Sequence, residues 1–201
     1  MALRALPLWL ASIALAGCSA APGASESYDV ANDDTVAAEE SAIIGGVASA
    51  GDPAIVGIAA TRPGQEGSSL CTGTVISPTV VLTAAHCVDP AVIGGDDATF
   101  VVLTDPNLTD GVAADGRLAV KEVHWDPQFN SRNLPDGHDI AVVILAEPTT
   151  ITPIPWNSAP LPASLRNTQV RIVGYGLSNG FNQTGAGVKR TAATRLIRFN
   201  D

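Results

Sequence analysis

From Ile43 onward the sequence predicts an all-β fold, either a barrel or a sandwich. Short runs rich in apolar and β-branched residues are separated by clusters of Gly, Pro, Asp and Asn, which favour turns. No window longer than a few turns has the 3.6-residue apolar period of a helix. The expected strands are residues 54–60, 79–83, 99–104, 118–123, 140–145 and 170–173.

The turn clusters set the order of these elements along the chain. Gly94-Gly95-Asp96-Asp97 precedes the third expected strand, and Leu134-Pro135-Asp136-Gly137 precedes the fifth. The fifth strand is continuously apolar from Ile140 to Leu145, as expected for a strand in a protein core. Together the runs and turns are typical of an all-β domain.

Composition narrows the class of protein further. The 201 residues are 46% hydrophobic and 15% charged, which is enough apolar surface for one globular core plus a tail. With 11 Lys and Arg against 20 Asp and Glu, the net charge is -9. Because no basic stripe is present to neutralise phosphates, we expect no nucleic-acid partner.

The first eighteen residues, 1–18, have the layout of a secretory signal peptide. Arg4 precedes an apolar stretch that is too short to span a bilayer. The run Leu15-Ala16-Gly17-Cys18 resembles a bacterial lipobox, in which Cys18 is lipidated and becomes the first mature residue. The alternative is a plain signal peptide cut near Ala20 and Ala21. Either way we expect export.

The predicted destination follows from the same segment. We expect a bacterial cell-envelope lipoprotein, at the outer membrane because Ser19 is not an aspartate, or a protein secreted after processing. A lipid on Cys18 is then the chain's sole expected contact with a membrane. Residues 19–42 carry only acidic charges among Ala, Ser and Gly, which predicts a disordered tether or propeptide.

The three cysteines divide between these two parts of the chain. If Cys18 is lipidated or removed, Cys71 and Cys87 remain as a pair in an oxidising compartment, and one disulfide is the simplest expectation. Two isolated cysteines offer too few ligands for a structural metal, so we expect no metal. We also expect no cofactor.

Three segments carry residues suited to chemistry. Leu82–Cys87 places His86 directly beside a half-cystine, Gly137–Leu145 places Asp139 at the start of an apolar strand, and Ser41–Gly46 leads from the acidic tail into two isoleucines and two glycines. Singly, each has an ordinary explanation, since a lone histidine or an aspartate at a strand end is more often structural than catalytic.

In this order the segments resemble the chymotrypsin-like (trypsin-type) serine proteases. Ile43–Gly46 is similar to their mature N-terminus, Thr83–Cys87 to their catalytic histidine motif, and Asp139–Leu145 to their catalytic aspartate strand. Leu70–Ile76 and Val173–Gly176 extend the resemblance, which covers about residues 43–176.

The resemblance implies an antiparallel double β-barrel with residues 43–150 in the first barrel and 151–201 in an incomplete second one. It also implies a serine endopeptidase acting on polypeptides, in which a serine attacks the peptide carbonyl, His86 transfers its proton and Asp139 orients the imidazole. Ile43 would be the N-terminus freed by activation. His124 and His138 are expected to be structural, with His138 on the opposite face of the strand from Asp139.

The sequence departs from the family in one respect: it contains no Gly-Asp-Ser-Gly-Gly segment. We therefore expect the chain as printed to stop before the nucleophile, midway through the second barrel, and to be inactive. Gly176-Leu177-Ser178-Asn179-Gly180 fits the G-x-S-x-G pattern, but the order of residues argues against Ser178 as a nucleophile. The alternative function is a protease-derived binding or remnant lipoprotein without catalysis.

Overall fold

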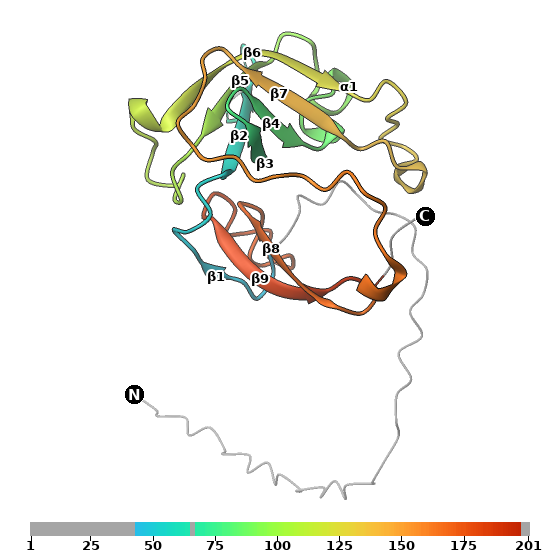
Figure 1. Cartoon of the computed structure of the whole chain (residues 1–201). Helices are drawn as coiled ribbons and strands as arrows, with labels where there is room; N and C mark the ends of the chain where they lie inside the picture. The colour runs from blue at the N-terminus through green and yellow to red at the C-terminus, as the bar shows by residue number, and fades with distance from the viewer. Residues whose placement is uncertain (1–42, 65–66, 198–201) are drawn as a thin grey trace, which may run out of the picture. The chain divides into compact units, whose positions relative to one another are not determined.

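A computed structural model describes residues 43–64 and 67–197, all within one compact unit (Figure 1). Six antiparallel strands close a barrel in the order β2-β3-β4-β7-β6-β5. Their bounds are β2 Ile55–Thr61, β3 Ser69–Ser77, β4 Val80–Thr83, β5 Thr99–Leu103, β6 Arg117–Trp125 and β7 Ala141–Leu145. Closure gives each of these strands two hydrogen-bonded neighbours.

The barrel interior is the hydrophobic core. Alternate residues of β7 are buried, as the period of two in a strand requires, so Ala141, Val143 and Leu145 point inward. They meet inward residues of the other strands, and most members of this cluster are 0–3% exposed. The remaining members are Ala54, Val56, Ile58, Val75, Val81, Cys87, Val88 and Val102.

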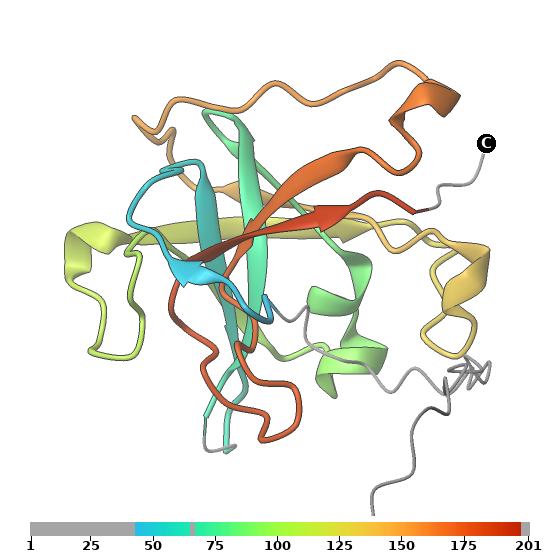
Figure 2. The same ribbon diagram turned by 90° about the horizontal axis from the view of Figure 1, so that it is seen from below.

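A second, three-stranded sheet has the order β1-β9-β8. Its strands are β1 Val47–Ala48, β8 Gln169–Gly174 and β9 Arg190–Arg195, and Figure 2 shows them side by side. Because β1 precedes the barrel in sequence yet pairs with β9, the chain enters the second sheet, builds the barrel and then returns.

Short helical segments connect the strands. The helix α1 spans Pro90–Ile93, where Asp89 caps it by accepting a hydrogen bond from the Ala91 amide. The 3₁₀ turns of the described residues are η1 Ala85–Cys87, η2 Ala114–Gly116, η3 Leu134–Asp136 and η4 Ala163–Leu165. In the described ranges, none of the helices has both the length and the apolar character needed to cross a membrane.

Polar contacts join the second sheet to the start of the barrel. Arg171 on β8 makes two 2.7 Å bonds to the Asp52 carboxylate, and this guanidinium holds the pKa of Asp52 below its usual value. The buried Lys189 ammonium donates to the carbonyl oxygens of Asp52 and Ile55. Burial lowers the pKa of Lys189, and the charge of Asp52 partly opposes that shift.

The buried Tyr175 makes a second link between the sheet and the barrel. Its amide donates to the Thr72 hydroxyl at 3.0 Å, and its own hydroxyl donates to the Asp105 carbonyl at 2.8 Å. Burial raises the pKa of this phenol, which keeps it protonated as a donor. The Lys189 ammonium also lies 5.7 Å from the centre of the Tyr175 ring.

The predicted all-β class is confirmed, and each of the six predicted runs overlaps a strand. The predicted strand 140–145 begins one residue later, at Ala141. Strands β1, β3 and β9 were not predicted. The signal peptide 1–18 with its lipobox Cys18 and the tether 19–42 lie outside the described residues.

Candidate active site

His86 lies on η1, directly after β4. The segment that leads into His86 is held in place by two features. The Thr83 hydroxyl donates a hydrogen bond to the Thr72 carbonyl, and Ala85 is fully buried. Next to His86, Cys87 forms a disulfide with Cys71 of β3, with 6.0 Å between the two Cα atoms. The backbone that carries the imidazole is therefore attached to the barrel by packing and by a covalent bond.

Asp139 reaches His86 from the segment between η3 and β7. Its Oδ2 lies 2.8 Å from His86 Nδ1, and its Oδ1 accepts the His86 backbone amide at 2.9 Å. Both side chains are 31% exposed. With one oxygen on the ring and the other on the backbone, the carboxylate fixes both the position and the rotation of the imidazole.

This geometry sets what the imidazole can do. An ionised carboxylate only accepts hydrogen bonds, so the pairing places the ring proton on Nδ1 and leaves the Nε2 lone pair free. A free Nε2 on a partly exposed ring can take a proton from a hydroxyl and return it later. The pair is thus suited to general acid and base chemistry.

Ser178 is held within its own loop. Its amide donates to the Thr184 carbonyl at 3.0 Å, and its hydroxyl lies 3.5 Å from the same oxygen. The next residue, Asn179, forms an isolated bridge with Thr184. The segment is therefore a closed surface loop after β8, and these contacts do not connect Ser178 with the imidazole pair.

Ile43, the predicted activation N-terminus, is packed against the same loop. Its side chain is 5% exposed, and its backbone nitrogen donates to the Leu177 carbonyl at 2.7 Å. Gly46 lies so close that an added Cβ would be 2.5 Å from the Ile43 side chain. Ile44, by contrast, is 64% exposed.

One cluster of residues that could bind a metal ion lies at the site. The potential ligand atoms of Cys71, His86 and Cys87 are within 4.8 Å of one another. The two sulfurs are bonded to each other, so this group offers no thiolate, the form of cysteine that binds metals. Across residues 43–64 and 67–197 no other such group occurs.

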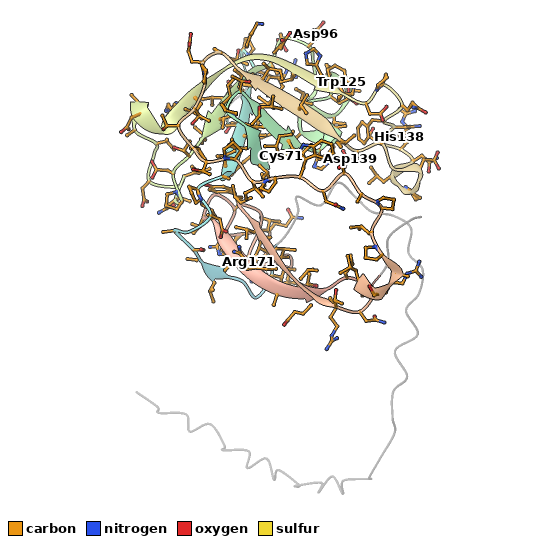
Figure 3. All side chains as sticks on the ribbon, viewed as in Figure 1. Cys71, Asp96, Trp125, His138, Asp139 and Arg171 are labelled. Atoms are coloured by element: carbon orange, nitrogen blue, oxygen red, sulfur yellow. A yellow bond between two sulfur atoms is a disulfide. The ribbon has the colours of Figure 1, made fainter. Side chains whose placement is uncertain are left out.

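A second histidine–carboxylate pair lies beside the first and was missed from the sequence. His138 Nδ1 lies 2.9 Å from Asp126 Oδ2, and Figure 3 labels His138 next to Asp139. We expected His138 to lie on the strand. It instead precedes β7, in a backbone conformation with φ 64°. The neighbouring Gly137 was the one sequence signal for such a turn. His124, the third histidine, is 3.5 Å from Glu122 on the outside of β6.

Comparison with known proteins agrees with this fold. A family profile described as Trypsin matches residues 43–195. The chain belongs to the trypsin family.

Relatives of this trypsin-family chain include chymotrypsin-like elastase family member 1 from two mammals. The Bos taurus protein is 34% identical over 119 residues, which are 57% of this chain and 42% of the relative. The Homo sapiens protein is 36% identical over 91 residues, which are 45% of this chain and 33% of the relative. The chain thus spans less than half the length of these relatives.

A solved structure titled HL collagenase shares the fold. It matches with a TM-score of 0.57 at 23% identity, covering 78% of this chain and 64% of that chain. The likeness supports the chymotrypsin-like architecture for the barrel and the second sheet.

Proposed function

We propose that this chain is the part of a serine endopeptidase that supplies the general base and its orienting carboxylate. The observation that carries the proposal is the pair of hydrogen bonds between Asp139 and His86, in which one carboxylate oxygen contacts the ring and the other accepts the backbone amide. Polypeptides are the proposed substrates. Both residues lie in the proposed first-barrel segment, residues 43–150, of whose described strands β1 alone pairs with the second sheet.

The proposed chemistry is acyl transfer. A serine hydroxyl attacks the peptide carbonyl while its proton moves to His86 Nε2, which gives a tetrahedral oxyanion and an imidazolium. Asp139 stabilises the imidazolium through Nδ1–H. The imidazolium then delivers the proton to the leaving amine, and the same sequence with water as the nucleophile releases the acid.

We propose that the nucleophilic serine is not among the 201 printed residues, which contain no Gly-Asp-Ser-Gly-Gly segment. The chain alone would then orient a base without a nucleophile and would not hydrolyse peptides. The missing segment equally supports the alternative function, a binding protein derived from a protease. The experiment must therefore distinguish the endopeptidase from the binding protein.

Export and activation complete the proposal. We propose that residues 1–18 direct export with a lipid on Cys18, and that Ile43 is the N-terminus of the processed domain. The burial of the Ile43 side chain against the Leu177 loop supports a fixed position for this residue. Residues 151–201 are proposed as the first part of a second barrel.

The test is labelling with a serine-reactive phosphonate. The printed chain should not react, whereas a protein made from the whole gene, including any codons after Asp201, should react at one serine. The His86→Ala variant of that protein should lose at least about a thousandfold in labelling rate. A gene that stops at Asp201, together with no label, would instead favour the binding protein.

A further inference from the structure

Both chain neighbours of Asp139 are bound to one residue, Asp126. The Asp126 carboxylate Oδ2 lies 2.9 Å from His138 Nδ1, and the Asp126 amide donates to the Ile140 carbonyl at 3.0 Å. Within the turn, the Ile140 amide donates to the His138 carbonyl at 2.8 Å. Asp139 is therefore the centre of a short segment whose two ends are fixed to the same point.

The backbone of this segment has a conformation that costs energy for a residue other than glycine. Gly137 has φ 78° and His138 has φ 64°, so two successive residues have a positive φ directly before Asp139. For a histidine this region is sparsely populated, and such conformations persist where the surroundings stabilise them. The contact of the His138 ring with Asp126 is a stabilising interaction of this kind.

Asp126 is itself well fixed. It follows the last residue of β6, Trp125, which pairs with Ala141 of β7. Its Oδ1 accepts the Gln128 amide at 2.8 Å, and its carbonyl accepts the Phe129 amide. The Gln128 amide, followed by the His138 contact, lowers the pKa of Asp126, so its carboxylate is ionised and accepts a hydrogen bond from His138 Nδ1–H.

We infer that Asp126 and His138 are positioning residues, which hold the turn so that Asp139 directs both carboxylate oxygens at His86. This inference rests on the proposed function, because it concerns the same general-base pair. Neither residue touches His86 in the bonds that define the site; both act through the backbone of residues 138–140. The pair of side chains is partly exposed, at 35% for His138 and 24% for Asp126, so its effect is expected on geometry more than on global stability.

Two substitutions at His138 separate the backbone from the ring. His138→Gly favours the left-handed backbone and removes the contact with Asp126. His138→Asn also tolerates this conformation and keeps a side-chain N–H that can donate to Asp126. Asp126→Ala removes the contact from the other partner, and His124→Ala, an exposed histidine on β6, is the matched control.

The readout is hydrogen exchange of the His86 Nδ1–H, followed by NMR on the full chain. We expect exchange to rise roughly tenfold in His138→Gly and Asp126→Ala and to stay within about twofold of wild type in His138→Asn and His124→Ala. The backbone amide spectrum of the barrel checks that each variant is folded.

The inference is overturned if folded His138→Gly and Asp126→Ala keep the wild-type exchange rate, since the pair would then be a surface contact only. It is also overturned if His138→Asn behaves like His138→Gly. A wild-type His86 without a protected Nδ1–H is a different result, because it would contradict the proposed function itself.

Discussion

The barrel and the three-stranded sheet differ in how their edges are satisfied. In the barrel every strand has two hydrogen-bonded neighbours, and inward residues such as Val56 and Val143 are fully buried. In the sheet, β8 bonds to β9 alone among the described strands, and its apolar residues Val170 and Ile172 are only half-buried. The barrel therefore has a core of its own, whereas the sheet relies on contacts with the barrel.

This difference explains where the site geometry comes from. His86 and Asp139 are attached to the barrel through β4, β7 and the Cys71–Cys87 disulfide. The second sheet contributes none of the hydrogen bonds between them. The hydrogen bonds of the imidazole pair therefore come from residues attached to the barrel, and we expect them to persist when the second sheet is weakened.

The largest expected effect separates the two regions directly. Leu145→Ala removes a side chain that is 2% exposed in the barrel core, and should cost about 2–5 kcal/mol of unfolding free energy. Ile172→Ala in β8 removes a half-buried side chain and should cost less than half as much. Urea unfolding followed by tryptophan fluorescence measures both. Equal losses would mean that the sheet packs as tightly as the barrel.

A smaller effect is expected at the link between the regions. Tyr175→Phe removes the buried hydroxyl that donates to the Asp105 carbonyl, and should lower the free energy of unfolding by about 1 kcal/mol. Amide hydrogen exchange should increase in β8 and β9 while the barrel core stays protected. If protection falls evenly across both regions, the link is not a local attachment and the comparison fails.

The sequence predicted the barrel strands better than the strands of the sheet for a physical reason. Apolar runs such as 140–145 identify strands buried in a core. By contrast, β9 reads Arg-Thr-Ala-Ala-Thr-Arg, and β1 has only two residues, so neither has an apolar pattern. Their pairing depends on a chain return of more than 140 residues, from Val47 to Thr191, which no local pattern encodes.

The candidate site likewise has a part that the sequence predicted and a part that it did not. The resemblance of short motifs identified His86 and Asp139, although 53 positions separate them and no spacing rule brings them together. The pairing of Asp126 with His138 was not predicted, because it depends on a left-handed turn and on the end of β6 meeting the start of β7. Tertiary contacts of this kind become visible only in the folded chain.

The smallest expected effect concerns the ion pair between Arg171 and Asp52. Because the Arg171 guanidinium lowers the pKa of Asp52, the pair stabilises the fold above the ordinary carboxyl pKa of 3.8, and this contribution is lost as the pH falls through the lower folded value. Arg171→Met should therefore reduce stability slightly at neutral pH, by less than Tyr175→Phe. At strongly acidic pH the variant and the wild type should converge; a constant difference at all pH values would exclude the linkage.

The tautomer of the neutral His86 ring, measured by ¹⁵N NMR in wild type and in Asp139→Ala, is the most direct test of the imidazole–carboxylate pair. The pair predicts a proton on Nδ1 and a free Nε2 in wild type, with a shift toward the Nε2-protonated form once the carboxylate is removed. A wild-type ring protonated on Nε2, or a tautomer that Asp139→Ala leaves unchanged, would contradict the assignment of His86 as an oriented base.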